Sequence, residues 1–256
     1  MTMLLRARDL IFTVAETPLV NGVSIDAEAG ELVAVVGPNS AGKSTLLRLM
    51  AGELAPHSGS VTIGGESASR AQLGELALLR SYLGQHPPVD VPFTVREVVA
   101  MGRHPHRTRP DNTKAADDDA VDSALMTTDV AHLTLRVFAT LSGGEAQRVN
   151  IARVLAQDAP VALLDEPTAA LDIGHREVVM GSLRSVADRG GAVVAVLHDL
   201  NLAAMFADRL LLLHEGKAVS TGPPGDVLSE ETLTRVYGHP VRVIDHPFRD
   251  SLLVLP

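Results

Sequence analysis

The sequence predicts an α/β protein with a parallel-sheet core, an N-terminal antiparallel β subdomain and an inserted α-helical subdomain. Apolar runs at 31–36, 161–164 and 192–197 are typical of strands buried on both faces of a sheet. Each run is followed by a loop and a segment with helical spacing, as in parallel sheets. We therefore expect one domain, residues 1–256, with a core from 1–86 and 157–256 and a helical subdomain at 87–156.

The N-terminal segment alternates apolar and polar residues. This alternation predicts two strands and a third strand with its turn. The expected features are a strand at 4–14, a turn at 16–18, a strand marked by Val23 and Ile25 that ends at 29–30, and a strand and turn at 60–65. These strands would form the antiparallel β subdomain.

Helical spacing prevails from residue 86 to about residue 157. We expect it to be broken by Pro87-Pro88 and by a loop at 102–112. Beyond the last core strand, 210–221 predicts a hairpin with its turn at 215–217, and 230–237 predicts a short helix.

Composition excludes several classes of protein. The formal net charge is −9 and aromatic residues are 3%, so neither the basic face nor the base-stacking platform of a nucleic-acid-binding protein is expected. With no cysteine, the chain can form no disulfide and no thiolate metal site. No apolar run approaches the roughly 18 residues of a membrane span, and the first six residues do not resemble a signal peptide.

The most specific motif is Gly37-Pro38-Asn39-Ser40-Ala41-Gly42-Lys43-Ser44, placed between an apolar strand and a helix that continues with Thr45. This is a P-loop, so the core is expected to be of the P-loop NTPase (RecA-like) type. Its glycines let backbone amides converge on a phosphate at a helix N-terminus. Lys43 is expected to reach the outer phosphates and Ser44 to ligate Mg²⁺.

Polar residues follow the predicted core strands at 161–164 and 192–197 and a further predicted strand end at 80–85, at the edge where α/β proteins bind ligands. Asp165 is expected to hold Mg²⁺ through water, and Glu166 to polarise the attacking water. His198 is a candidate for orienting that water or stabilising the γ-phosphate. Gln85 is a candidate for contact with the Mg²⁺ or the water.

A second glycine-containing segment, Leu141-Ser142-Gly143-Gly144-Glu145, precedes another helical pattern. Ser142 with Glu145 three residues later predicts a capping box. Its amides could also form an anion site that lacks a lysine. The segment has no obvious use within its own subunit, so we expect a second copy of the chain to complete the active site.

In combination and order, these motifs resemble those of the ATP-binding subunits of ABC transporters. The resemblance covers nearly the whole chain: Gln85 matches the Q-loop, 141–145 the signature, Ala170-Leu171-Asp172 the D-loop and His198 the switch histidine. It implies ATP hydrolysis with Mg²⁺, and a homodimer in which Ser142, Gly143, Gly144 and Glu145 face the nucleotide of the opposite subunit. It also implies a polytopic permease dimer, an indirectly associated substrate-binding protein and a peripheral location at the cytoplasmic face of the inner membrane.

Two residues depart from the family pattern. Glu145 stands where the signature usually has glutamine, although a carboxylate in a first helical turn is favoured by the helix dipole. Val14 stands where an aromatic residue usually stacks on adenine, and Phe12 is expected to face elsewhere.

The segment 98–106 resembles the helical subdomain in the ATPases of importers for haem, iron-siderophores and vitamin B12. The tail 236–256 looks most like the tail of the ATPases of haem importers. Import of haem is therefore the first expectation, and import of ferric siderophore or cobalamin the alternative. We interpret the basic loop 103–109 as a solvated, permease-facing surface rather than as a haem or metal site.

Two further alternatives come from other classes. A soluble ABC ATPase of translation or DNA repair would be expected to have tandem cassettes, a coiled coil or a basic surface. A P-loop kinase would leave residues 141–145 and His198 without a role.

Overall fold

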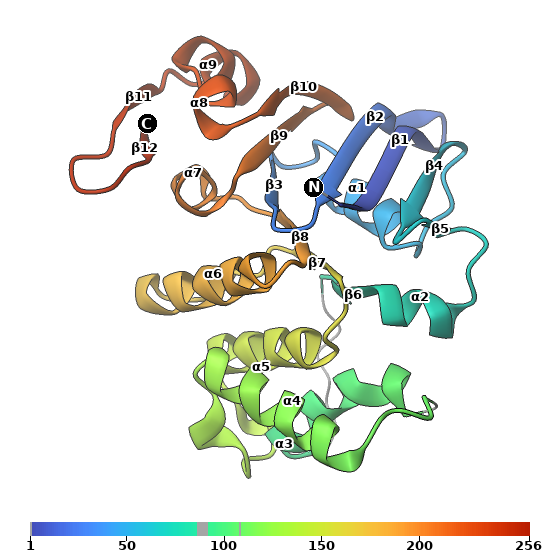
Figure 1. The fold of residues 1–256 in the computed structure, drawn as a ribbon. Coiled ribbons are helices and arrows are strands. Elements are labelled where there is room, and N and C mark those ends of the chain that lie inside the picture. The colour runs from blue at the N-terminus through green and yellow to red at the C-terminus, as the bar shows by residue number, and fades with distance from the viewer. Residues whose placement is uncertain (1, 86–91, 108) are drawn as a thin grey trace.

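The computed structural model describes residues 2–85, 92–107 and 109–256, and its centre is a six-stranded sheet (Figure 1). The strand order is β10-β9-β3-β8-β7-β6, with parallel pairing except between β9 and β10. The strands are β3 (Leu32–Val36), β6 (Arg80–Leu83), β7 (Val161–Asp165), β8 (Ala192–Val196), β9 (Arg209–His214) and β10 (Lys217–Gly222). Every residue of β3, β7 and β8 is buried, which confirms the three predicted core strands.

The predicted N-terminal β subdomain is an antiparallel sheet of order β2-β1-β4-β5. Its strands are β1 (Met3–Val14), β2 (Thr17–Glu28), β4 (Ser58–Ile63) and β5 (Glu66–Ser67). The first turn is Ala15-Glu16, one residue before the expected 16–18, because both residues adopt positive φ and Pro18 already pairs with Thr13. Proline is tolerated there because β2 is an edge strand that needs no second hydrogen-bonded neighbour.

Two apolar layers cover the parallel sheet, one on each face. Along β3, Val33 and Val35 join the cluster that contains α1 (Lys43–Met50) and the antiparallel sheet. Leu32, Ala34 and Val36 join the opposite cluster with α6 (Ile173–Asp188) and α7 (Leu200–Phe206). The strand alternation therefore holds the P-loop helix and the helices after β7 and β8 on opposite faces, with their loops meeting at one edge.

The helical part has a separate apolar core and lies below the sheet in Figure 1. It contains α3 (Val95–Ala100), η1 (Met101–His106), α4 (Lys114–Thr127), η2 (Ala131–Leu133), η3 (Phe138–Thr140) and α5 (Gly143–Ala156). A further helix, α2 (Leu73–Leu79), precedes β6. The expected break at Pro87-Pro88 lies outside the described residues.

The expected loop at 102–112 is wrong over its first five residues, which belong to the 3₁₀ helix η1. The expected solvation of its basic residues is wrong for Arg103, which is buried. Its guanidinium pairs with Asp117 at 2.8 Å and donates to the Ala156 carbonyl at 2.9 Å. His106 bonds the Gln157 carbonyl through Nε2 at 2.7 Å. The segment is therefore anchored to α4 and α5 by the basic side chains that suggested an exposed loop.

The predicted hairpin at 210–221 and helix at 230–237 are confirmed by β9–β10 and by α9 (Glu230–Tyr237). The turn is Glu215-Gly216, since Lys217 already pairs with His214. A short helix α8 (Pro224–Val227) and a hairpin of β11 (Arg242–Asp245) and β12 (Leu252–Leu255) were not predicted. The hairpin is held to α7 by Asn201, which exchanges two hydrogen bonds with the Val254 backbone at 2.7 and 3.2 Å.

Within the described ranges, no helix combines the length and the apolar character needed to cross a bilayer.

Candidate active site

The P-loop joins β3 to α1, and two of its glycines are required by close backbone contacts. An added Cβ at Gly37 would lie 2.1 Å from the Leu213 carbonyl oxygen, and one at Gly42 would lie 2.1 Å from the Leu19 carbonyl oxygen. Both glycines also have positive φ, at 145° and 98°. No side chain can occupy these positions without moving β9 or β2, so the loop needs glycine at both ends.

The N-terminus of α1 is open to a ligand. Its N-cap residue is Gly42, and no side chain caps the first turn. The first amides of a helix lack partners within the helix and carry positive partial charge. Asn39 and Ser40 are exposed beside them. This end of the helix can therefore receive a phosphate group.

Lys43 is the buried cation of the loop. Its ammonium donates to the carbonyl oxygens of Gly37 and Pro38, each at 2.7 Å. Burial lowers the pKa of Lys43, while the charges of Glu166 and Asp165 oppose this shift. The amine is thus fixed at the loop by two neutral acceptors, where it can exchange them for phosphate oxygens.

Three oxygen-bearing side chains meet beside Lys43. Ser44 Oγ donates to Asp165 Oδ1 at 3.2 Å, and the Gln85 amide nitrogen lies 3.3 Å from Ser44 Oγ. A hydroxyl, a carboxylate and an amide suit Mg²⁺, which prefers oxygen ligands and retains water and phosphate in its shell. Among the residues that the structure describes, no group of three or more His, Cys, Asp or Glu side chains could hold a metal. Burial raises the pKa of Asp165, and the Ser44 hydrogen bond opposes this shift.

Glu166 lies between two of the predicted catalytic residues. Its Oε1 is 2.6 Å from His198 Nε2 and 3.1 Å from the Gln85 amide nitrogen. These residues come from the ends of β7, β8 and β6, which are neighbours in the sheet. The fold therefore brings Gln85, Glu166 and His198 together at one point.

The backbone at Glu166 is unusual and is supported from α5. Glu166 has φ of 51°, a left-handed conformation that is uncommon for residues other than glycine. Gln147, buried on α5, donates to the Pro167 carbonyl at 3.3 Å and to the Glu166 carbonyl at 3.5 Å. Gln147 was not predicted from the sequence, since Asn150 lies on the same helix face and a glutamine there is not distinctive.

The P-loop faces a cavity of about 430 Å³. Its described lining is Leu19, Asn39, Ser40, Gly42, Lys43, Ser44, Thr45, Gln85, Glu166 and His198. The predicted signature residues 142–145 are absent from that lining. Within the described part of one chain, the structure therefore brings together the P-loop and the strand-end residues but leaves the signature elsewhere.

The signature segment begins α5 with the predicted capping box. Ser142 Oγ accepts from the Glu145 amide at 3.3 Å, and the Glu145 carboxylate accepts from the Ser142 amide at 2.8 Å. Glu145 also pairs with Arg136 at 3.3 Å. Hydrogen bonds from Ser142, led by its backbone amide, lower the pKa of Glu145. The glutamate is thus used locally, while Ser142 and Gly143 remain exposed.

Asp172 is the N-cap residue of α6. The first turn of this helix contacts both the loop after β7 and the loop after β8. The Asp172 carboxylate accepts from the His175 amide at 2.9 Å. Arg176, which sequence analysis missed, donates to the Leu171 carbonyl at 2.9 Å and lies 3.7 Å from Asp199, the residue after His198. The signal for Arg176 was only its position one turn after Asp172.

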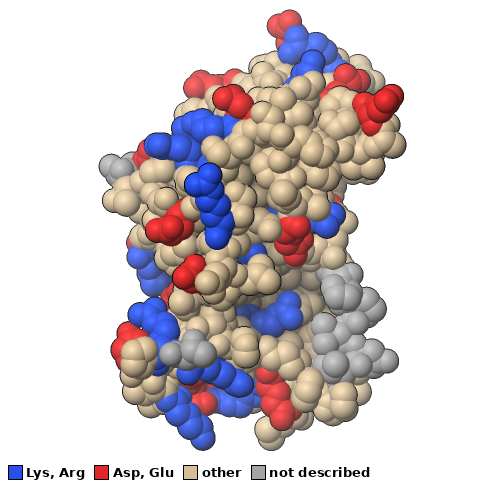
Figure 2. Space-filling model, turned by 90° about the vertical axis from the view of Figure 1, so that its right-hand side faces the viewer, with Lys and Arg blue, Asp and Glu red and all other residues tan. Residues whose placement is uncertain are grey.

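A second cleft, of about 520 Å³, lies between α1, β6 and α5. It shares Ser44, Thr45, Gln85 and Asp165 with the P-loop region and is lined further by Arg48 and Arg153. Burial lowers the pKa of Arg153. Figure 2 shows the face turned by 90° from Figure 1: Lys and Arg are spread over both halves of this face with Asp and Glu among them, and basic atoms lie inside the hollow. This cleft is a polar surface adjoining the Gln85 end of the site.

Neither residue considered for adenine stacking presents a free aromatic ring. Val14 is half exposed at the end of β1. Phe12 stacks on His57, with ring centroids 5.1 Å apart. Phe12 is therefore engaged within the β subdomain, as expected.

The ABC transporter family matches residues 20–169, which include the P-loop, the signature and the strand-end carboxylates. The chain belongs to the ABC transporter family. As its ATP-binding member, it is an ATPase whose hydrolysis is coupled to transport. The fold described above is that of this family, so the earlier resemblance is confirmed.

Relatives of high identity share one name. The chain is 49% identical to the hemin import ATP-binding protein HmuV of Rhodococcus jostii over 98% of this chain and 86% of that protein. It is 53% identical to the protein of the same name from Nocardia farcinica, over 91% and 81%. The Rhizobium meliloti protein of that name is 42% identical, over 99% and 98%.

Solved structures agree with the fold. An inward-facing putative metal-chelate type ABC transporter contains a chain with a TM-score of 0.82 and 28% identity, covering 99% of this chain and 96% of its own. A dimeric ATP-binding cassette, MJ0796 bound to ADP and Pi, has a TM-score of 0.75 and 26% identity, covering 86% and 98%. The chain therefore has neighbours described both as a transporter and as a dimeric cassette.

Proposed function

We propose that the chain is the ATPase subunit of a haem importer and that each of its active sites is shared between two copies. The observation that carries the proposal is the convergence of Lys43, Glu166 and His198 at the P-loop cavity, from which the signature is absent. Asp165 joins them through its hydrogen bond with Ser44. A dimer that pairs each cavity with the exposed signature of the other copy would supply the missing contacts. The dimeric cassette among its structural neighbours supports this arrangement.

In this mechanism the P-loop amides and Lys43 bind the outer phosphates of ATP. Glu166 accepts a proton from the attacking water, and His198, 2.6 Å from its carboxylate, holds that carboxylate in place. Gln85 fixes the other side of the same oxygen. Because the P-loop amides are already oriented, little reorganisation of the backbone is required when charge develops on the γ-phosphate.

Mg²⁺ would be held by Ser44, with Asp165 acting through water and with the amide oxygen of Gln85 as a further ligand while its N–H group donates to Glu166. When bound, the ion supplies charge stabilisation to the phosphate oxygens. The domain division that we propose assigns these residues to 1–86 and 157–256 and the signature to the helical subdomain at 87–156.

Replacement of the proposed base tests this mechanism. Glu166→Gln retains the shape of the side chain and removes the proton acceptor, so we expect turnover to fall about 100-fold or more. ATP binding should persist, and ATP-bound dimers should accumulate on size exclusion. Turnover at the wild-type rate would contradict the assignment of Glu166.

Haem is the proposed cargo because relatives that are 42–53% identical over nearly the whole chain are named hemin import proteins. The partner would be a polytopic permease dimer that docks near Gln85 and the second cleft, with a substrate-binding protein on the far side of the membrane. The subunit would be peripheral, at the cytoplasmic face of the inner membrane. Uptake of haem by the reconstituted complex, dependent on ATP, is the expected result.

A ferric siderophore or cobalamin is the alternative cargo. The specific support is the 28% identical chain from a putative metal-chelate type transporter. Competition between haem and each chelate in the same vesicles separates the two. Uptake of a chelate without uptake of haem would favour the alternative.

A further inference from the structure

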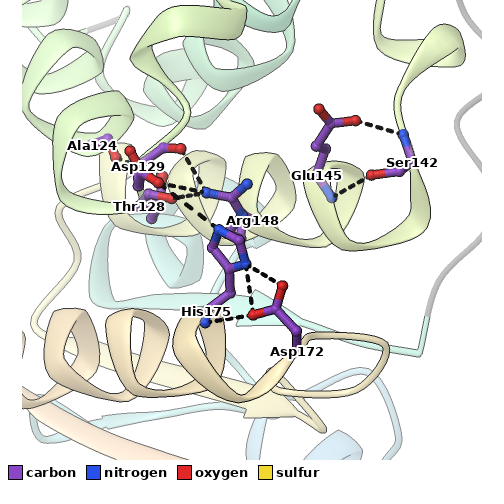
Figure 3. Close-up of polar contacts among 8 residues, drawn as sticks. All are labelled: Ala124, Thr128, Asp129, Ser142, Glu145, Arg148, Asp172 and His175. Atoms are coloured by element: carbon purple, nitrogen blue, oxygen red, sulfur yellow. Dashed lines mark hydrogen bonds and ion pairs between the residues drawn. The ribbon is translucent and has the colours of Figure 1, made fainter.

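A polar network joins three segments that surround the start of α6 (Figure 3). Arg148, on the signature helix α5, is buried. It donates to the Asp129 carbonyl at 2.6 Å, to the Thr128 carbonyl at 3.3 Å and to Asp129 Oδ2 at 3.2 Å. A buried guanidinium with three such bonds fixes the turn after α4 to α5.

The turn itself is held in one conformation. Asp129 has φ of 54°, and the fully buried Thr128 donates its hydroxyl to the Ala124 carbonyl at 2.9 Å. The Asp129 carboxylate therefore extends toward α6 from a hydrogen-bonded turn.

His175, on the first turn of α6, lies between two carboxylates. Its Nδ1 is 2.8 Å from both carboxylate oxygens of Asp172, so this nitrogen carries a proton and donates. Its Nε2 lies 3.9 Å from Asp129 Oδ2, within ion-pair distance when the imidazole is protonated on both nitrogens. Figure 3 shows the imidazole between the residues of α5 and the α4 turn on one side and Asp172 on the other.

The signature and the Asp172 segment also touch directly. A Cβ added at Gly144 would lie 3.3 Å from the Ala170 carbonyl oxygen and 3.6 Å from a Leu171 methyl group. Ala170 has φ of 60°, so this short segment makes a tight turn against α5. The backbone contact sets how close the two segments lie, and the His175 network can set their orientation.

We propose that His175 is a positioning residue that locks the segment 170–172 to the signature helix, so that both meet the partner subunit's nucleotide as one preformed surface. The proposal deepens the shared-site function and rests on it. His175 contributes nothing to the P-loop cavity, whose described lining excludes it. Replacement of His175 should therefore weaken ATP-driven dimerisation and leave the binding of nucleotide by a single subunit unchanged.

The first experiment separates binding within one subunit from binding across the dimer. In a Glu166→Gln background, ATP-driven dimerisation is measured by analytical ultracentrifugation, and a fluorescent ATP analogue measures the affinity of the monomer. His175→Ala is expected to raise the dimer dissociation constant about tenfold, since it removes a charge-assisted hydrogen bond. The monomer affinity for the analogue should change less than about twofold, because the P-loop is untouched.

Two conservative variants test whether both carboxylates matter. His175→Asn keeps a donor near the Nδ1 position, facing Asp172, and His175→Gln keeps one near Nε2, facing Asp129. The proposal expects each variant to weaken the dimer, since neither reaches both partners. If His175→Asn had the same dimer dissociation constant as the parent, His175 would act only on the N-cap of α6, and the proposal would be overturned.

The second experiment tests the lock without reference to nucleotide. The chain has no cysteine, so Ile173→Cys and Leu135→Cys, both at strongly exposed positions, can carry spin labels without background. The distance distribution between them should be narrow in the parent and broader with His175→Ala. An unchanged distribution would overturn the proposal. If the distribution broadens but the Glu166→Gln parent never dimerises with ATP, the lock stands and the shared-site function fails.

Discussion

The chain contains two glycine-containing loops that precede helices, and they differ in how their first amides are used. At α1 the N-cap is Gly42, no side chain caps the turn, and Lys43 is buried beside it. At α5 the N-cap is Ser142, and a complete capping box closes the turn. The first turn of α1 therefore leaves its amides free of side-chain caps, whereas the first turn of α5 is already capped by its own side chains.

The largest expected difference between the loops is in nucleotide binding by one subunit. Lys43→Ala removes the buried cation, so the affinity of the monomer for ATP and the turnover should each fall about 100-fold. Ser142→Arg places bulk at an exposed position and should leave the monomer affinity unchanged while abolishing turnover. Equilibrium binding to the monomer and steady-state hydrolysis check both statements, and equal losses of affinity would break the comparison.

A matched pair of glycine substitutions tests the packing of the two loops. Gly42→Ala forces a Cβ against the Leu19 carbonyl at a positive φ and should reduce the free energy of unfolding by about 3 kcal/mol. Gly143→Ala meets no atom within 4 Å and should leave stability unchanged or slightly raised, since alanine favours a helix. Urea unfolding of both variants provides the measurement. Comparable losses would contradict the contrast.

The cap of α5 should contribute a smaller amount to stability. Ser142→Ala removes the hydroxyl that accepts from the Glu145 amide, which should lower the free energy of unfolding by about 1 kcal/mol. Thermal unfolding detects such a change. The same method applied to the conservative Ser142→Thr, which retains the acceptor, should show little loss.

The smallest effect is expected at Glu145. Glu145→Gln keeps an acceptor for the Ser142 amide but loses the half-exposed pair with Arg136, which should lower the free energy of unfolding by about 0.5 kcal/mol or less. Because hydrogen bonds lower the pKa of Glu145 in the folded state, its contribution is present above its ordinary pKa of 4.5 and is lost as the pH falls through the folded value. The difference between wild type and variant should therefore shrink on acidification below pH 4.5, as urea titrations at several pH values can show.

The core could be predicted from sequence because its signals are local. A short apolar run such as 161–164 by itself indicates a strand that is buried on both faces of a sheet. The P-loop motif likewise predicts a strand, a turn and a helix in succession. The capping box of Ser142 was predicted for the same reason. The P-loop motif also contains its own chemistry, in Lys43 and Ser44.

The contacts that the sequence did not predict are formed between distant segments. The sequence predicted that Arg103 would be exposed to solvent, but its side chain is buried against Asp117 and the end of α5. The support of Glu166 by Gln147 and the position of His175 between Asp129 and Asp172 depend on how helices pack, which no local pattern encodes. The β11–β12 hairpin was missed because its strands are four residues each and depend on α7.

The most direct test of shared active sites is complementation between Lys43→Ala and Ser142→Arg chains, each with its own affinity tag. In the mixed dimer, one cavity has an intact P-loop from the Ser142→Arg chain and an intact signature from the Lys43→Ala chain. The account predicts that neither chain alone hydrolyses ATP and that the purified mixed dimer recovers single-turnover hydrolysis at one site. Full activity of the Ser142→Arg chain alone, with no gain on mixing, would contradict it.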